Sequence, residues 1–440
     1  MRTRDKRRTT RQLLSIGAIT STLGLAGGLV APTAASASNS VTITYWSWNP
    51  GTVIMTEQAK AFEKLNPNVT VDVSAPTYDD YLVALKAAAN AGKMPTVFGA
   101  QEGGMARQYQ PYSVSLGPLA TKSLGSNWKA GFLPAGLSAA QVGNTPGNTN
   151  FYYLPESLQS TAMLINTAWF TKLKVPVPTT FQQMIADAKV FNANNQPLMV
   201  VGGEDGWQNE DVFLQFANQT APGQFYSAEA SGKGFTSPGL VSAMTYFKDL
   251  FTDHIVEKDE LGAVYYPTLA NTFQTQGTGG MSPLGSWTLS AALKSASPPD
   301  PLTKAWTYVP FPKLCSTCKP VPLTGADVIV GLGNTSTGAV QAAGWKFLQF
   351  LTQGGGETIY ADQLIDLPSK TGLIPTGPLS DLYLPNGIAL FNHFEALANE
   401  GTPRYVVNPN LNTALITALA NVASGQKSPE AALASLNGIS

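Results

Sequence analysis

The amino-terminal part of this 440-residue chain alternates between short apolar runs and longer stretches with helical spacing. Residues 41–46 and 69–73 alternate β-branched with polar side chains, and residues 95–98 form a short apolar run, which are patterns typical of strands. Between these runs, residues 56–65 and 78–91 carry apolar side chains three and four positions apart. An order of strand, helix, strand, helix, strand favours a parallel sheet covered by helices. The sequence therefore predicts an α/β fold.

Indole, amide and acidic side chains follow two of these predicted strands. Trp46, Trp48 and Asn49 end the first strand, and Gln101 and Glu102 follow the third. The carboxyl ends of parallel strands meet at one edge of a sheet, and ligands bind there. We therefore expect these five residues to lie close together at a binding site.

A second constraint comes from a strand pattern that is interrupted by proline. Residues 151–154 are aromatic and apolar, as in a buried strand. Pro155 has no N–H to donate, so strand pairing is expected to stop there, and Glu156 follows. A new apolar run covers residues 162–166. A strand that leaves one sheet, bends and enters another is a hinge, which would place Glu156 in a cleft. The alternative is one strand with a surface glutamate before a turn.

Both kinds of pattern continue through the rest of the chain. Apolar residues recur at helical spacing in the segments 181–188, 240–251, 340–351 and 411–422. Strands are predicted for the segments 197–201, 280–287, 306–310 and 327–331. A chain of this length exceeds what one hydrophobic core usually supports, which favours two domains.

Tryptophan recurs beside polar residues in loops that follow predicted strands. Asp205 precedes Trp207 in a glycine-rich loop, and Trp287 ends another strand. A pyranose packs its apolar C–H face on an aromatic ring, and its hydroxyls bond to planar acceptors and donors. We interpret these residues as candidate sugar ligands, together with Tyr78 at the start of a predicted helix and Asp327 at the start of a predicted strand. The alternative is that each tryptophan belongs to the core.

Other classes of chemistry have little support in the sequence. His254 and His393 are the only histidines and have no metal-type neighbours, so neither a metal site nor a Ser–His–Asp triad is expected. No cofactor-binding motif is present, and no cofactor is expected. Cys315 and Cys318 are spaced for a small structural disulfide in an exported protein. Beyond residues 1–37, which carry six basic residues and one acid, the formal net charge is −6 and no basic tract is present, which argues against nucleic acid as a partner.

The amino terminus has the pattern of an export signal. Basic residues crowd the first eleven positions, a weakly apolar run covers residues 13–31, and Ala35 and Ala37 form a small-x-small cleavage pattern. We interpret residues 1–37 as a secretory signal peptide, with a membrane anchor as the alternative. Arg7 and Arg8 are a partial twin-arginine signature, and no lipobox cysteine is present.

In this order and spacing, several segments resemble the extracellular solute-binding proteins of carbohydrate ABC importers, in the maltose-binding-like branch. The resemblance covers essentially the whole mature chain. Residues 61–69 match a segment with phenylalanine, glutamate and Asn-Pro-Asn-Val. Similar matches are the segments 43–46, 91–97, 153–156, 285–287, 343–348 and 424–433.

The resemblance implies a two-lobed periplasmic-binding-protein fold of the class II type, with discontinuous lobes that close at a hinge. The expected lobes are residues 38–154 with 311–350, and residues 155–310 with 351–440. It also implies that Glu156 binds sugar hydroxyls, that Trp287 stacks on the sugar, and that Gln101 and Glu102 form a polar pair of the first lobe.

The function implied is that of an exported, monomeric, non-catalytic receptor that delivers a mono- or oligosaccharide to the permease subunits of an ABC transporter. Ligand would select the closed state of the two lobes. Two alternatives remain open. The same fold could bind a polyamine, a peptide or a metal chelate, because an acidic aromatic cleft also holds cations. An exported glycosidase would use paired carboxylates.

Overall fold

The computed structural model describes residues 40–144, 147–292, 306–363, 365–375 and 387–439. Residues 40–440 form one compact unit. The predicted export segment, residues 1–37, lies outside the described residues. No helix in the described part of the chain is both long and apolar enough to cross a bilayer.

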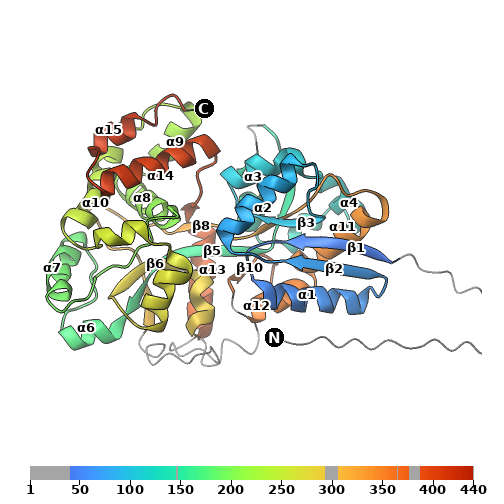
Figure 1. The fold of residues 1–440 in the computed structure, drawn as a ribbon, viewed down its shortest axis with the longest axis horizontal. Helices are drawn as coiled ribbons and strands as arrows, with labels where there is room; N and C mark the ends of the chain where they lie inside the picture. The colour runs from blue at the N-terminus through green and yellow to red at the C-terminus, as the bar shows by residue number, and fades with distance from the viewer. Residues whose placement is uncertain (1–39, 145–146, 293–305, 364, 376–386, 440) are drawn as a thin grey trace, which may run out of the picture. The chain divides into compact units, whose positions relative to one another are not determined.

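The first sheet has five strands in the order β2-β1-β3-β9-β4. β1 pairs in parallel with β2 and with β3, as the sequence predicts. β9 lies antiparallel to both β3 and β4, so the sheet is mixed rather than purely parallel. Figure 1 shows β1, β2 and β3 side by side. The strands are β1 (Val41–Trp46), β2 (Val69–Ser74), β3 (Val97–Ala100), β4 (Tyr153–Pro155) and β9 (Ile329–Leu332).

Helices cover both faces of this first sheet. On one face, Phe62 of α1 and Phe347 of α11 pack in one cluster with Val97 of β3. The next residue of β3, Phe98, points to the other face and packs in a second cluster with Tyr81 of α2. The helices are α1 (Thr52–Leu65), α2 (Tyr78–Asn90), α3 (Gly104–Tyr109), α4 (Gly117–Leu124), α5 (Pro134–Val142), α11 (Gly338–Gln353) and α12 (Gly355–Asp362), with short 3-10 turns η1 (Gln110–Tyr112) and η2 (Trp128–Gly131).

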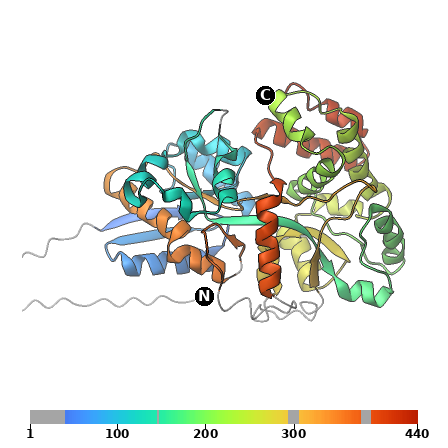
Figure 2. The same cartoon turned by 180° about the vertical axis from the view of Figure 1, so that it is seen from behind.

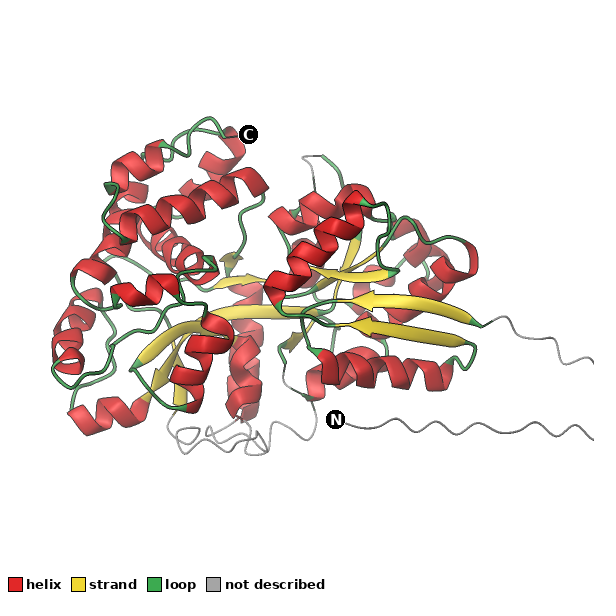
Figure 3. Cartoon of the chain, viewed as in Figure 1, coloured by secondary structure: helices red, strands yellow, loops and turns green. Residues whose placement is uncertain are grey.

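The second sheet is built around the long strand β5, all of whose residues are buried. β5 pairs antiparallel with β6, β7, β8 and β10, and β11 adds to β8 in parallel. β5 runs between the two groups of strands that Figure 3 colours yellow. The strands are β5 (Ser157–Asn166), β6 (Met281–Gly285), β7 (Trp306–Val309), β8 (Leu323–Gly325), β10 (Leu367–Pro368) and β11 (Thr402–Pro403).

A large apolar core lies beside the second sheet, between its helices. Thr180 caps α7 with a capping box to Gln183, and the Ser428 side chain caps α15. Seen from behind, α13 stands next to β5 (Figure 2). The helices are α6 (Thr167–Leu173), α7 (Phe181–Asn192), α8 (Trp207–Thr220), α9 (Gln224–Ser231), α10 (Pro238–Thr252), α13 (Gly387–Glu400), α14 (Pro409–Ala423) and α15 (Pro429–Ala434), with short turns η3 (Lys258–Gly262), η4 (Tyr265–Leu269), η5 (Asn271–Thr275) and η6 (Ser286–Ala292).

One local expectation is confirmed and one is corrected. Strand pairing stops at Pro155, as the sequence predicts, because Pro155 is the last residue of β4 and lies opposite Ile329. Its missing N–H costs nothing at that position, since the strand ends there. The predicted strand at residues 197–201 is a buried extended segment with a single bridge, between Met199 and Met281. Its apolar composition comes from burial and not from a continuous ladder.

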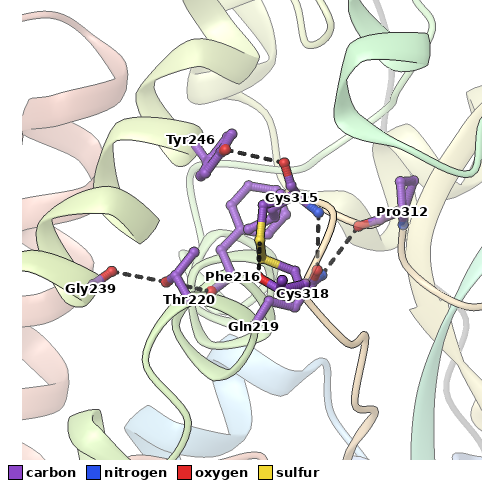
Figure 4. Close-up of a disulfide and its surroundings, with 10 residues drawn as sticks. Phe216, Gln219, Thr220, Gly239, Tyr246, Pro312, Cys315 and Cys318 are labelled. Carbon is purple, nitrogen blue, oxygen red and sulfur yellow. Dashed lines mark hydrogen bonds between the residues drawn. A yellow bond between two sulfur atoms is a disulfide. The ribbon is translucent and has the colours of Figure 1, made fainter.

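The two cysteines form a disulfide in a loop that packs on α8 and α10 (Figure 4). The Gln219 amide donates to the Pro312 carbonyl at 3.2 Å and accepts from the Leu314 N–H at 3.1 Å. The Tyr246 hydroxyl donates to the Leu314 carbonyl at 3.1 Å. The disulfide therefore closes a loop whose preceding residues are already anchored by side chains of α8 and α10.

Candidate functional site

A cavity of about 320 Å³ lies between elements of the first sheet and helices that cover the second sheet. One wall is formed by α2, α3 and the residues that follow β3. The other wall is formed by α8, α14 and the segment before α14. The lining residues are Tyr78, Asp79, Leu82, Gln101, Glu102, Gly104, Met105, Gln108, Asp205, Trp207, Glu210, Asp211, Arg404, Tyr405, Val406, Pro409, Asn412, Thr413 and Ile416.

Five of the residues predicted from the sequence line this cavity: Tyr78, Gln101, Glu102, Asp205 and Trp207. The Tyr78 hydroxyl donates to the Gln101 side-chain carbonyl at 2.5 Å. The Trp207 indole N–H donates to Asp205 at 2.9 Å. The structure thus brings together two predicted strand-end groups that are about a hundred residues apart in the chain.

Trp46, Trp48 and Asn49 lie behind this wall and are not among the lining residues. The Trp48 ring packs against the Tyr78 ring, with centroids 5.3 Å apart. Trp46 is half-buried and packs against the adjoining apolar cluster. The end of β1 therefore supports the wall that carries Tyr78.

Asp327 and Trp287 also lie outside the lining. Asp327 accepts a hydrogen bond from the Asn49 amide. Burial raises the pKa of Asp327, and the nearby Arg404 opposes this shift. Trp287 lies with its face against the Arg404 guanidinium, at 4.4 Å from the ring centroid. That indole face is therefore covered by a protein cation.

Glu156 connects β4 to β5, where the chain passes from the first sheet to the second. Its side chain is fully buried and accepts a hydrogen bond from the Gln58 amide at 3.1 Å. Burial raises the pKa of Glu156 to about 8. Glu156 does not line the cavity in this structure, so it contacts α1 rather than a cleft.

Sequence reasoning missed the group at the centre of the site, Arg404. Its side chain is almost fully buried, and its Nε donates to Asp211 at 2.9 Å. Its Nη1 donates to Gln159 and, at 3.0 Å, to the Tyr405 hydroxyl. Burial lowers the pKa of Arg404, but Asp211 and Tyr405 raise it by more, so Arg404 stays charged.

Tyr405 joins the two walls of the cavity. Its hydroxyl oxygen accepts from Gln101 at 3.3 Å and from Gln159 of β5 at 2.8 Å. The next residue, Val406, accepts at its carbonyl from the Gly104 N–H at 3.0 Å. The adjacent Gly103 has φ +77°, and a Cβ there would lie 2.8 Å from Cβ of Tyr405. A glycine is therefore required for this close approach.

Three carboxylates of the cavity are incompletely bonded, of which Glu102 and Glu210 are buried and Asp205 is half-buried. Burial raises the pKa of Glu102 and of Glu210 to about 8, and that of Asp205 to about 6. One oxygen of each has no hydrogen-bond partner within the described residues: Oε1 of Glu102, Oε1 of Glu210 and Oδ1 of Asp205. Buried acceptors without donors are rare in folded proteins, and these three oxygens have almost no accessible surface.

Two features of the sequence could have revealed the missed residues. After Lys370 the chain contains only two basic residues, Arg404 and Lys427. An isolated arginine between Pro403 and Tyr405 is therefore a candidate for an ion pair with a specific acid. In α8, residues 208–219 are all buried, although more than half of them are polar. A buried helix with this much polarity requires polar partners.

In the described part of the chain, no group of three or more His, Cys, Asp or Glu is placed to hold a metal ion.

Comparison with known proteins gives a consistent result. Residues 45–357 match the family described as bacterial extracellular solute-binding protein. A search of curated proteins found no match. Among solved structures, a chitin oligosaccharide binding protein is 22% identical, with a TM-score of 0.77, and the alignment covers 91% of this chain and 98% of that one.

Two further solved structures have the same fold. One comes from work on xylan utilization by Caldanaerobius polysaccharolyticus, with 20% identity, a TM-score of 0.76, and 90% and 99% of the two chains covered. The other is a maltose-bound protein of T. maritima, with 17% identity, a TM-score of 0.74, and 90% and 98% covered. These likenesses show the two-lobed, periplasmic-binding type of α/β fold.

Proposed function

Because the chain belongs to the family of bacterial extracellular solute-binding proteins, we propose that it binds a mono- or oligosaccharide and delivers it to the permease of an ABC importer. The family consists of solute-binding proteins rather than enzymes, and we propose that this chain has no catalytic activity. The titles of similar structures name chitin oligosaccharide and maltose as ligands of those proteins.

The observation that carries the proposal is the composition of the cavity. Trp207 provides an aromatic ring, and Gln101 and the carboxylates provide planar hydrogen-bonding groups on both walls. A pyranose has an apolar face and a rim of hydroxyls, so it fits both kinds of group. Hydrogen bonds to charged groups contribute about 1.5–3 kcal/mol each, more than bonds between neutral groups.

The packing of the elements supports a division into two lobes that differs from the one expected from the sequence. β9 lies in the first sheet, and α12 packs on α1 and α11. β8 and β10 lie in the second sheet. We propose that the first lobe contains residues 40–155 and 326–362 and that the second contains residues 156–325 and 363–440.

We propose that residues 1–37 direct export and that the mature protein acts as a monomer outside the cytoplasm. The family is extracellular, which supports export. A monomer leaves both lobes free to move relative to each other on binding.

A sugar panel followed by calorimetry tests the proposal. We expect at least one sugar to raise the melting temperature, because a ligand that binds only the folded state stabilises it. The Trp207→Ala variant should then bind that sugar at least tenfold more weakly. A matched control is Trp169→Ala, because Trp169 is also half-buried but packs on the core of the second sheet, away from the cavity.

Two results would overturn the proposal. One is a panel in which no sugar shifts the melting temperature and a polyamine does. The other is equal loss of affinity in the Trp207→Ala and Trp169→Ala variants, since that would trace the effect to general destabilisation.

A further inference from the structure

The cavity has a large excess of acidic groups. Its lining contains five acids, namely Asp79, Glu102, Asp205, Glu210 and Asp211, against a single base, Arg404, and it contains no lysine or histidine. The chain as a whole is close to neutral, with 27 basic and 28 acidic residues. The excess is therefore a local property of this cavity.

Arg404 does not neutralise this excess, because its single positive charge is paired with Asp211. Its Nε lies 2.9 Å from Oδ1 and 3.1 Å from Oδ2 of Asp211. Its Nη1 bonds to Gln159 and Tyr405. Its planar face covers Trp287. A charged guanidinium held this way balances Asp211 and leaves the remaining acids without a counter-charge.

The remaining buried acids are Glu102 and Glu210, which approach the cavity from opposite walls. They are only 2% and 5% exposed. Oε2 of Glu102 accepts from the Ala326 N–H at 3.3 Å, and Oε2 of Glu210 accepts from the Asn412 amide at 2.5 Å. Oε1 of each has no partner within the described residues. Ionised carboxylates in such surroundings are costly unless a cation is nearby.

We propose that the guest is an amino sugar, whose ammonium group supplies the positive charge that the protein leaves out of the cavity. The inference rests on the proposed function, since it names the class of saccharide that the same cavity takes. The ammonium group donates up to three hydrogen bonds, and carboxylates are strong acceptors for such charged donors. An anionic sugar would bring a further negative charge to a lining with five acids and one base, so we expect it to bind most weakly.

The surroundings of these two acids determine whether ligand binding takes up or releases protons. Glu102 faces Arg404 and Asp327, and Glu210 faces Asp211 and Arg404. With pKa values raised to about 8, both carboxyls are mostly protonated at pH 7. A nearby ammonium group favours the ionised form. Binding of an amino sugar at pH 7 is therefore expected to release protons, and binding of a neutral sugar is not.

The test compares sugars that differ at a single position. Titration calorimetry at low salt uses glucosamine, glucose and glucuronic acid, the corresponding galactose series, and the β-1,4-linked disaccharides chitobiose, N,N'-diacetylchitobiose and cellobiose. Each titration is repeated in two buffers of different ionisation enthalpy. We expect the amino form to bind at least tenfold more tightly than its neutral counterpart, with proton release, and the uronic acid to bind most weakly.

Two variants test whether the preference for the amino form comes from the cavity. Glu210→Gln removes one carboxyl group that an ammonium group could ionise in the cavity, and Glu57→Gln removes one carboxylate from the exposed surface of α1. We expect Glu210→Gln to reduce the preference for the amino form at least threefold and Glu57→Gln to leave it unchanged. If Glu210→Gln does not fold, Glu102→Gln replaces it.

The outcomes separate the two proposals. Equal or tighter binding of the neutral form overturns this inference and leaves the proposed function intact. An unchanged preference in the cavity variant overturns it as well. If no sugar in any series binds, the proposed function fails and the inference fails with it.

Discussion

Replacing Arg404 by methionine tests the role of the buried ion pair most directly. Methionine keeps an unbranched apolar side chain and removes the charged guanidinium. Asp211, which is 4% exposed, would then be buried without its cation. Removing one partner of a buried ion pair costs about 3–5 kcal/mol, because the remaining charge is uncompensated. The variant should also lose the packing of the guanidinium on Trp287.

This free energy converts to a measurable change in melting temperature. Unfolding entropy is about 2.1 cal/mol/K per residue, so a unit of about 400 residues unfolds with about 0.8 kcal/mol/K. A loss of about 3–5 kcal/mol should therefore lower the melting temperature by about 4–6 °C in scanning calorimetry. The control is Lys427→Met, which removes an exposed cation and should change stability by less than about 0.5 kcal/mol.

The double variant decides whether the pair is the cause. In Arg404→Met with Asp211→Asn, neither charge is left uncompensated, so the loss should be smaller than the sum of the two single losses. A change below 1 °C in the Arg404→Met protein, or strict additivity in the double variant, would refute the reasoning.

Three further predictions concern the same structure. Gly325→Ala should lower both the melting temperature and ligand affinity, because a Cβ there would lie 1.8 Å from Oε1 of Glu102; a wild-type melting curve would contradict this. Glu102 and Glu210 have pKa values near 8 when folded and near 4.5 as ordinary glutamates. The folded state therefore holds more protons between these values, and the melting temperature should fall as the pH rises from 5 to 8; a Glu102→Gln variant that keeps the full slope would count against it. Replacing Cys315 and Cys318 by alanine opens a loop with a sequence separation of 3 and should cost about 2 kcal/mol; urea titration with no shift in midpoint would show that the helix contacts suffice.

Local patterns predicted the elements whose stability is determined locally. The apolar stripe at Leu411, Leu415 and Leu419 gave α14, and the β-branched alternation at residues 41–46 gave β1. Each pattern reflects one buried face, and the residues of that face are close in the chain. The likeness to two-lobed binding proteins followed from the order of such elements.

Pairing between distant segments could not be predicted in the same way. β8 and β11 have three and two residues; β8 forms between β5 and β11, and β11 forms only against β8. No periodicity can be recognised in so few residues. The reversed direction of β9 in the first sheet has the same origin, because it depends on where a distant segment returns.

The candidate site shows the same limit. Gln101 and Glu102 were identified because they follow a strand, which is a local feature. The position of Arg404 over Trp287 was not, because the two residues are more than a hundred positions apart and meet only in the folded protein. Glu156 was recognised correctly as the residue between two strands, but its burial against Gln58 depends on the packing of α1.

The hydroxyl of Tyr405 is within bonding distance of three N–H donors, from Gln101, Gln159 and Arg404. A phenol oxygen has only two lone pairs, so at any moment one of the three donors is in surplus. An arriving hydroxyl or amide can recruit that spare donor without breaking a bond that the empty protein needs. The three donors around one oxygen atom thus leave the site with one N–H group available to a ligand.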